Sequence, residues 1–423
     1  MSSVDEQRKP EKALVPSLRF EGFNDPWEQR KLEEVATFGG GHTPSMADPC
    51  NYENGSIPWI TSQDVKSQRL DKTTTLITDK GAAELNLYPV GSLVVVVRSG
   101  ILRHTLPVAE LQKPMTVNQD IRVIVPTEAL SSHWLLGYLE GNSRNLLLKF
   151  GKVGTTVESI NFSEMKSMGL MMPSREEQSR IGSLFAKLDS LIALHQRKHG
   201  KLKTVKQSLL EKMFPKEGED VPEIRFEGFT EPWEQRKFGE LALLRRGLTY
   251  TPNDVVDAQQ GTRVLRSSNI NEDRFELSSD DVFVCEDAVN IDPVQNNDIL
   301  ITAANGSGRL VGKRALIKGL TDSAVHGGFM LLASTEEPDF LNAAMGAEWY
   351  RRFLHMGVAG GNGALGNLDS KALRDYDLLV PNQGERKAIG ALFQKLDSLI
   401  ALHQRELEIL KNLKKAMLEK MFV

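Results

Sequence analysis

The sequence predicts an α+β protein. In it, two mixed α/β domains are joined by two long helices that pack as an antiparallel coiled coil, in a pseudo-twofold cyclic arrangement. Three observations predict this fold class. The chain repeats several of its own segments in the same order, each half ends in a long proline-free stretch with helical spacing, and the middles share strand patterns but almost no identity. A fixed frame with two different inserts is typical of a protein that reads two different things at a fixed separation.

The repeated segments stand at matching places in the two halves of the chain. KLDSLIALHQR occurs at 187–197 and 395–405, LEKMF at 210–214 and 418–422, RFEGF at 19–23 and 225–229, and PWEQRK at 26–31 and 232–237. Because the segments between them have nearly equal lengths, we interpret the whole chain as a duplication with one frame.

Each half ends in a predicted helix. The first, Glu176–Phe214, contains no proline, and its apolar residues follow the alternating four- and three-residue spacing of a coiled-coil seam. The predicted seam residues are Leu184, Leu188, Leu191, His195 and Leu202 in the first copy and Leu392, Leu396, Leu399, His403 and Leu410 in the second. A helix of roughly 58 Å is too long for one compact domain, so we expect the two copies to pack on each other as a spacer. The repeated histidines could form a paired site, but a polar seam position that sets the register is the preferred interpretation.

Short polar segments connect these parts. Pro215 ends the first helix, and a polar linker leads into RFEGF of the second half. We expect the equivalent N-terminal piece to pack where the second helix ends and so to close a ring. The side chains expected to dock these pieces are Phe20, Phe23 and Trp27, with Phe226, Phe229 and Trp233 as counterparts.

The predicted domain boundaries follow from the repeats. They are 1–26 for the N-terminal segment that closes the ring, 27–174 for the first mixed domain, 175–214 for the first spacer helix, 215–232 for the linker and repeated segment, 233–382 for the second mixed domain and 383–423 for the second spacer helix. The predicted strands of the mixed domains are Ile57–Val65, Gly91–Gly100, Thr262–Ile270 and Asn297–Gly308.

Composition restricts the function. Hydrophobic and charged contents of 40% and 26% are ordinary for a soluble globular protein. Two distant cysteines fit a reduced compartment, and the start of the sequence has no apolar signal segment, so we expect a cytoplasmic protein. A net charge of −4 disfavours a DNA-binding protein that acts alone, because phosphate neutralisation supplies much of that affinity. It allows binding through a local patch or together with a partner.

The sequence contains no catalytic constellation. The Asn/Asp-Pro-Pro-aromatic loop of a DNA methyltransferase is absent, and Gly308–Arg314 resembles a phosphate loop but lacks Ser or Thr after its lysine. The histidines show neither HxxxH nor HExxH spacing. We therefore expect a chain without a catalytic residue and without a metal site.

Recognition chemistry remains. Arginine and asparagine or glutamine make the bidentate contacts that distinguish base edges, so polar residues at turns and strand ends are candidate base readers. In the first middle these are Thr61, Ser62, Gln63, Arg98, Ser99, Arg103, Lys152, Thr155 and Thr156. In the second they are Arg245, Arg246, Tyr250, Arg266, Ser268, Asn269, Asn305, Ser307, Arg309, Lys313 and Arg314. For any single one of them, an exposed loop residue without a role in binding is the alternative.

Several motifs together carry a family resemblance. They are the two PWEQRK segments, IPWITSQDV, LRSSNI, GTTVESINFSEM before Pro173, and EEQSRIGSLFAKLDSLI after it. In these motifs and their order the chain resembles the specificity subunit of bacterial and archaeal type I restriction–modification systems. One departure is visible, because Glu177-Gln178 of the first half corresponds to Glu385-Arg386 of the second.

The resemblance implies a function. Each middle would be a target recognition domain that reads one half of a split sequence in the major groove of double-stranded DNA. The paired helices would fix the unread gap and dock two modification subunits, which methylate adenine, and the assembly would recruit ATP-dependent restriction subunits. The chain itself would be non-catalytic, with S-adenosylmethionine, ATP and Mg²⁺ bound by the partner subunits, and no membrane would be involved.

Two other functions stay open from the residues alone. The chain could be a self-sufficient DNA methyltransferase or nuclease, which methylation assays on the isolated chain would reveal. It could also be a scaffold that holds two protein-binding heads without DNA. DNA binding measured with and without co-expressed partners would separate this scaffold from the specificity subunit.

Overall fold

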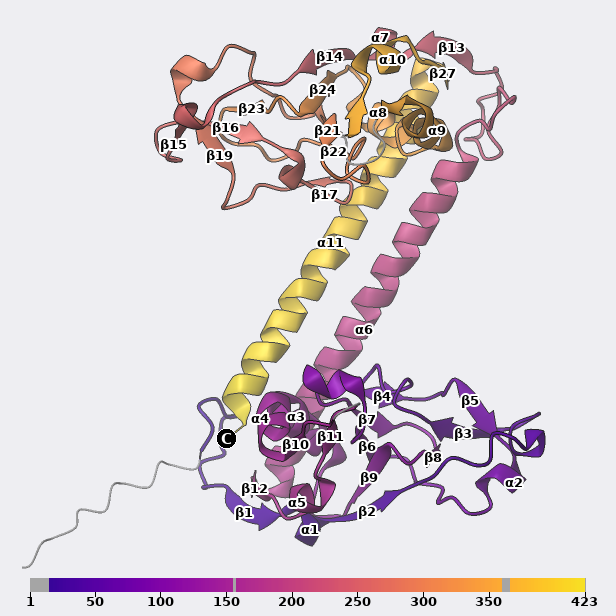
Figure 1. Ribbon diagram of the computed structural model, residues 1–423, viewed down its shortest axis with the longest axis vertical. Helices are drawn as coiled ribbons and strands as arrows, with labels where there is room; N and C mark the ends of the chain where they lie inside the picture. The colour runs from indigo at the N-terminus through magenta and orange to yellow at the C-terminus, as the bar shows by residue number, and fades with distance from the viewer. Residues whose placement is uncertain (1–14, 155–156, 360–365, 423) are drawn as a thin grey trace, which may run out of the picture. The chain divides into compact units, whose positions relative to one another are not determined.

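The computed structural model of the protein describes residues 15–154, 157–359 and 366–422. Contacts divide the chain into two compact units, of which unit 1 is Met1–Gln196 with Arg405–Val423 and unit 2 is Arg197–Gln404. Two long helices, α6 (Arg175–Lys212) and α11 (Gln383–Met421), each contribute one part to each unit (Figure 1). No helix in these described ranges is both long and apolar enough to cross a lipid bilayer.

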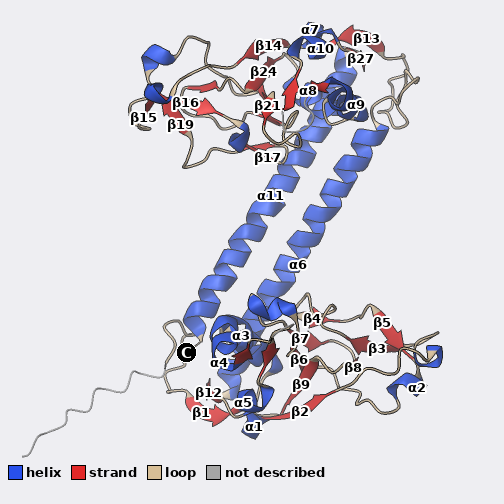
Figure 2. Ribbon diagram, viewed as in Figure 1, coloured by secondary structure: helices blue, strands red, loops and turns tan. Residues whose placement is uncertain are grey.

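Unit 1 combines short strands with short helices. Its strands are β1 (Glu28–Lys31), β2 (Ala36–Gly40), β3 (Ile57–Ile60), β4 (Arg69–Leu70), β5 (Thr75–Ile77), β6 (Leu93–Val96), β7 (Val108–Leu111), β8 (Thr116–Val117), β9 (Ile121–Pro126), β10 (Gly151–Lys152), β11 (Ser159–Ile160) and β12 (Gly169–Met172). Its helices besides the long ones are α1 (Leu32–Val35), α2 (Asp79–Ala82), α3 (Ser132–Gly141), α4 (Ser143–Phe150) and α5 (Phe162–Lys166). In Figure 2, α3, α4 and α5 lie at one end of unit 1 and β3 and β5 at the other.

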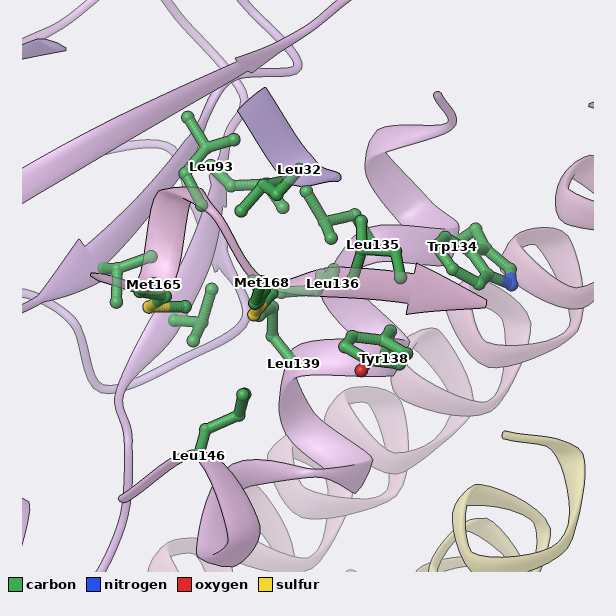
Figure 3. Close-up of a cluster of buried hydrophobic side chains, with 14 of the residues drawn as sticks. Leu32, Leu93, Trp134, Leu135, Leu136, Tyr138, Leu139, Leu146, Met165 and Met168 are labelled. Atoms are coloured by element: carbon green, nitrogen blue, oxygen red, sulfur yellow. The ribbon is translucent and has the colours of Figure 1, made fainter. Parts of the chain in front are cut away.

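Two sheets organise unit 1. One has the strand order β2-β9-β6-β7-β4 and the other β5-β3-β8. The central strand β6 is a run of Leu and Val that is buried along its whole length, which is the pattern of a strand covered on both faces. Figure 3 shows the core on one side of this sheet, where Leu135 of α3 lies near Leu32, which is next to Leu93, and Trp134 and Leu139 of α3 belong to the same cluster.

Unit 2 repeats the plan. Its strands are β13 (Glu234–Lys237), β14 (Leu243–Arg246), β15 (Val255–Val256), β16 (Thr262–Leu265), β17 (Ile270–Asn271), β18 (Arg274–Phe275), β19 (Val282–Val284), β20 (Ile299–Thr302), β21 (Ala304–Asn305), β22 (Arg314–Leu316), β23 (Ala324–His326), β24 (Met330–Ser334), β25 (Val358–Ala359), β26 (Gly366–Leu368) and β27 (Asp377–Val380). The shorter helices are α7 (Phe238–Leu241), α8 (Pro338–Ala344), α9 (Glu348–Gly357) and α10 (Ser370–Asp375).

The sheets of the two units have matching orders. In unit 2 they are β14-β24-β20-β22-β18-β17 and β15-β19-β16-β23, which extend the orders of unit 1 by one strand each. The predicted strands are present, but each ends earlier than expected. For example, β3 ends at Ile60 and β16 at Leu265, because the polar residues that follow form turns.

The same pairing joins the start of each repeat to the strand before its long helix. β1 runs antiparallel to β12, with Glu28 opposite Met172, and β13 runs antiparallel to β27, with Glu234 opposite Val380. The repeated PWEQRK segment is thus an edge strand in each unit.

A buried ion pair fastens each repeated RFEGF segment to the start of a long helix. In unit 1 the Arg19 guanidinium donates two hydrogen bonds of 2.8 Å to the Glu177 carboxylate. In unit 2 Arg225 donates two hydrogen bonds of 2.8 Å to Glu385. Such bidentate geometry is the strongest form of an arginine–carboxylate contact.

The segment at the start of each repeat is hydrogen-bonded to the end of a long helix. In unit 1 the N–H of Leu18 donates to the carbonyl of Lys420 near the end of α11, and in unit 2 the N–H of Ile224 donates in the same way to Lys212 at the end of α6. Trp27 and Trp233, two of the predicted docking side chains, are buried. The N-terminal piece therefore packs where the second helix ends, as the repeats predict.

Within each unit the two long helices pack antiparallel. In unit 1 Phe185 of α6 stacks on Phe422, which follows α11, and further along Asp189 pairs with Lys414 at 2.6 Å. In unit 2 Phe393 of α11 contacts Phe214, which follows α6, and Asp397 pairs with Lys206 at 2.6 Å. The phenylalanine of each repeated LEKMF segment thus packs into a hydrophobic core at the end of a long helix.

The seam differs in detail from the predicted one. Leu188 and Leu396 are buried, and Leu184, His195, Leu202, Leu392, Leu399, His403 and Leu410 are half-buried. Leu191 is 43% exposed, and the neighbouring Ile192 is less exposed than it. Ile181 and Phe185, and in the second copy Ile389, Phe393, Ile400 and Leu407, are buried as well. In the first copy the four–three spacing runs through Ile181, Phe185, Leu188 and Ile192. Leu191 lies beside this seam, whereas Leu188 and Leu396 belong to it as predicted.

Candidate nucleic-acid interface

Strand register matches the polar turns of the two units. β3 pairs in parallel with β8, and β16 pairs in parallel with β23. Thr61, which follows β3, is therefore equivalent to Arg266, which follows β16. A second match lies just before β9 in unit 1 and just before β24 in unit 2. The carbonyl of Asp120 accepts from the Val97 N–H at 2.8 Å, as the carbonyl of Phe329 accepts from the Ala303 N–H at 2.8 Å.

In unit 1 a carboxylate organises the first turn. Asp64 accepts hydrogen bonds from the backbone N–H and the hydroxyl of Thr61, at 2.8 and 2.9 Å, and from those of Thr74, both at 2.8 Å. Burial raises the pKa of the Asp64 carboxyl, but these four donors outweigh burial and hold it below its ordinary value. The turn therefore contains a stable anion, and the residues between Thr61 and Asp64 are held in one conformation.

In unit 2 an amide replaces this carboxylate. Asn269 accepts from the Arg266 N–H at 2.8 Å and donates to the Asp281 carboxylate at 2.7 Å. Sequence reasoning placed Asn269 at the surface as a base reader, but the structure places it in the interior with its amide engaged. An asparagine amide can complete a turn or contact a base edge with the same hydrogen-bonding groups. The residue type alone therefore did not distinguish these two roles of Asn269.

The predicted readers of unit 1 lie on turns, as expected. Gln63, Arg98, Arg103 and Lys152 are exposed, and Thr61, Ser62 and Ser99 are half-buried. Thr155 and Thr156 lie outside the described residues. Arg98 and Ser159 form an isolated β-bridge, so the end of β6 meets the hairpin of β10 and β11.

Two of these residues share a hollow. Arg103 and Lys152 line a depression of about 690 Å³, and Arg103 also forms an ion pair with Glu158. His104 and Arg144 line the same depression, although sequence reasoning did not select them. With three side chains that carry a positive charge against one carboxylate, the hollow has the electrostatic character that phosphate groups require.

Two predicted readers of unit 2 are engaged inside the fold, besides Asn269. Arg314 is buried and donates to the carbonyl of Asn342 at 3.0 and 3.2 Å, with its guanidinium over the ring of Tyr350. Arg245 is half-buried and donates to Asp298 at 3.1 Å. Sequence reasoning placed Arg314 at a surface turn, but the strand β22 directs it into the core.

The remaining predicted readers of unit 2 lie nearer the surface. Arg246, Ser268, Ser307 and Arg309 are exposed, and Tyr250, Arg266, Asn305 and Lys313 are half-buried. The structure brings Tyr250, Arg266 and Asn305 together in the lining of a cavity of about 730 Å³. It does not include Arg246, Arg309 or Lys313 in that lining.

Sequence reasoning missed an aromatic residue at this cavity. Phe329 lines it and is 64% exposed, which is unusual for so large an apolar side chain. The available signal was its position after Gly327-Gly328, since paired glycines mark a tight turn from which the next side chain can project.

Residues 24–204 match the family model of the type I restriction modification DNA specificity domain. By this match, that part of the chain is similar to a type I specificity domain. It covers the strands and short helices of unit 1 and most of α6, and the family resemblance of the sequence motifs is confirmed.

Two characterised relatives carry the same description. The specificity subunit of the type I restriction enzyme EcoR124I/EcoR124II from Escherichia coli is 32% identical over 166 residues, which is 39% of this chain and 41% of that protein. The specificity subunit of the type I restriction enzyme MjaIX from Methanocaldococcus jannaschii is 25% identical over 236 residues, which is 52% of each protein. The chain thus spans about half the length of these relatives or less in the matched regions.

A solved structure confirms the fold class. The S subunit of a type I restriction–modification system from M. genitalium superposes with a TM-score of 0.60 at 13% identity, over 97% of this chain and 99% of that one. At this identity the likeness concerns the fold, and it includes the part of the chain beyond residue 204 that the specificity-domain match leaves out.

Proposed function

We propose that the chain is the non-catalytic DNA specificity subunit of a type I restriction–modification complex. The observation that carries this proposal is the specificity domain in unit 1 together with the same strand order in unit 2. Each unit acts as a target recognition domain and reads one half of a bipartite target in the major groove of double-stranded DNA.

The side chains at equivalent turns support independent reading. Thr61 of unit 1 corresponds to Arg266 of unit 2, and Asp120 corresponds to Phe329. A hydroxyl, a guanidinium, a carboxylate and an aromatic ring make different contacts with base edges, so identical positions in the frame can specify different bases. The exposed Arg98 and Gln63 add further candidates in unit 1.

The net charge of −4 supports a role within a complex. Since affinity for duplex DNA depends on neutralised phosphates, most of the positive charge is supplied by partners. These partners are two modification subunits, which dock on the paired helices and methylate adenine, and restriction subunits that hydrolyse ATP. S-adenosylmethionine, ATP and Mg²⁺ bind the partners and not this chain, and the complex works in the cytoplasm of a prokaryote.

The test is single-molecule methylation sequencing of DNA from cells that express this chain with its modification subunit. The expected result is a split motif with methyladenine in each half, separated by unread base pairs. Cells that express the modification subunit alone are the control and give no such motif.

Two results would contradict the proposal. A continuous motif would mean that the two units do not read separate half-sites. The proposal would also fail if no motif appeared while the same modification subunit methylated DNA with another specificity subunit.

A further inference from the structure

The cavity of unit 2 has a composition that distinguishes it from the basic hollow of unit 1. Its walls come from the segment after β14, the turn after β16, the start of β21 and the turn between β23 and β24. Apolar side chains dominate the lining, with Leu248, Pro252, Val255, Val282 and Met330 among them. Arg266 is the one charged side chain among the described residues that line it, and no carboxylate does.

A rigid turn holds Phe329 at the rim. Its carbonyl accepts hydrogen bonds from the N–H groups of Ala303 and Ala304, at 2.8 and 3.0 Å. Gly328 packs closely on the segment after β14, because a Cβ added to it would lie 3.2 Å from the carbonyl oxygen of Leu248. The backbone is therefore fixed from both sides, while the aromatic ring itself is 64% exposed.

Unit 1 has a polar arrangement at the same place. Asp120 occupies the position of Phe329, and beside it the Thr43 hydroxyl donates to the side chain of Gln119 at 2.5 Å. The exposed ring is thus a property of unit 2 and does not belong to the frame that the units share.

Polar groups stand at the edge of the apolar walls. The amide nitrogen of Asn305 donates to the hydroxyl of Ser267 at 3.2 Å, and both residues line the cavity. An amide has a second N–H, and a hydroxyl that accepts one hydrogen bond can also donate one. A flat group with apolar faces and a polar edge matches this combination of aromatic, aliphatic and hydrogen-bonding surface.

We propose that the cavity receives one nucleobase of the half-site read by unit 2, displaced from its stack, with the Phe329 ring replacing a lost stacking contact. This inference rests on the proposed function, because it requires DNA along unit 2. The absence of carboxylates from the described lining and the presence of Arg266 suit an anionic polymer. Aromatic side chains stack on bases of any sequence, while Asn305, Ser267 and Arg266 can select a base by its edge.

The test uses the full chain in complex with its modification subunit and duplexes that carry the methylated split motif. 2-Aminopurine, whose fluorescence rises when it leaves the stack, replaces one base at a time in the half-site of unit 2. The adenine that becomes methylated and its partner base are left out, because methyltransferases extrude their target. Wild type is compared with Phe329→Ala and with Leu243→Ala, which removes an equally exposed side chain of unit 2 outside the cavity lining.

We expect a several-fold rise in fluorescence at one scanned position on binding of the wild type. Phe329→Ala reduces this signal to that of the free duplex, Leu243→Ala retains it, and Phe329→Trp restores it. Because Phe329 is exposed, its replacement leaves the fold intact, which an unchanged midpoint of urea denaturation reports. The inference is overturned if a complex that methylates the split motif raises the 2-aminopurine fluorescence at no scanned position. It is also overturned if the Phe329→Ala complex raises this fluorescence as much as the wild type does. Absence of any split motif would instead defeat the proposed function, and this inference with it.

Discussion

Unit 1 and unit 2 build the same turn with different side chains. After β3 the Thr61 N–H donates to the carboxylate of Asp64 at 2.8 Å, and after β16 the Arg266 N–H donates to the amide oxygen of Asn269 at 2.8 Å. What both units keep is an oxygen acceptor in one place. What differs is the side chain that the turn presents, a hydroxyl in one unit and a guanidinium in the other.

The repeated contacts show the opposite behaviour. The Arg19–Glu177 and Arg225–Glu385 pairs have the same bidentate geometry and the same 2.8 Å distances. The chain therefore has two kinds of position. In the frame the two halves agree in residue and contact, whereas the side chains presented at the turns differ between them. Four predictions test that division, from the largest expected effect to the smallest.

Exchange of the presented part should have the largest effect. Replacing the block from about Glu33 to Met172 with that of another specificity subunit is expected to change one half-site completely and leave the other unaltered. The block lies in unit 1 and stops before α6, so the frame is kept. Methylation sequencing measures the outcome, and a change in both half-sites would show that the units do not read independently.

Breaking the frame should cost stability equally in both units. Arg225→Ala leaves the buried Glu385 carboxylate without its partner, so we expect a loss of about 3–5 kcal/mol in the free energy of unfolding. Arg19→Ala should lose about the same amount, because its pair is equally buried. Urea denaturation checks both values.

An exposed ion pair supplies the control for this experiment. Arg236 pairs with Glu234 at 3.1 Å on the surface, and Arg236→Ala should change stability by less than about 1 kcal/mol. If Arg225→Ala behaved like this control, the RFEGF segment would not be part of the frame.

Replacing a lysine between the two long helices should destabilise unit 1 more than unit 2. Lys414 is 8% exposed and contacts both Glu140 and Asp189, whereas Lys206 is 16% exposed and contacts Asp397. We expect Lys414→Met to cost about 2 kcal/mol, because it leaves two carboxylates facing each other, and Lys206→Met about 1 kcal/mol. Denaturation of both variants measures the difference. Adding Glu140→Gln to Lys414→Met should recover part of the loss, and no recovery would argue against repulsion as its cause.

The smallest effect concerns pH. Burial holds the pKa of His326 below its ordinary value of 6.5, and its Nε2 lies 3.2 Å from the carbonyl of Arg245. As pH falls below 6.5 the unfolded chain binds the proton first, so His326 reduces stability progressively until its folded-state pKa is passed. The equivalent residue of unit 1 is Val117.

A matched variant isolates this contribution. His326→Val gives unit 2 the residue of unit 1, and we expect a flatter decline of stability between pH 6.5 and more acidic values. Thermal unfolding as a function of pH measures it, with wild type as reference. An unchanged slope would mean that His326 does not titrate differently in the folded chain.

Much of the fold followed from the repeats, because a duplicated frame must place equivalent residues in equivalent contacts. The contact between the start of each repeat and the end of a long helix could be predicted, because RFEGF and LEKMF recur at matching places in the two halves. The seam was harder to predict. Leu191 and Ile192 are both apolar, and only the packing of Phe185 and its neighbours decides which of the two turns inward.

The candidate site could be predicted less well. Residue type alone does not separate Asn269, which completes a buried turn, from Asn305, which lines a cavity, because both follow strands and carry the same amide. Arg314 was misplaced because the sequence does not show that β22 directs it toward Tyr350. Phe329 escaped attention because aromatic residues are expected in cores, and its exposure depends on a turn formed with residues far away in the chain.

The core of unit 1 includes Met421 and Phe422, whereas unit 2 is complete by Gln404. During synthesis on the ribosome the first domain to emerge is therefore the last to be finished. Because synthesis adds about 5–20 residues per second, Phe422 is made roughly 10 to 45 seconds after Gln196. During this time Trp134 and Tyr138 lack their contacts with Phe422. Translation rate and chaperone supply should consequently affect the yield of folded unit 1 more than that of unit 2.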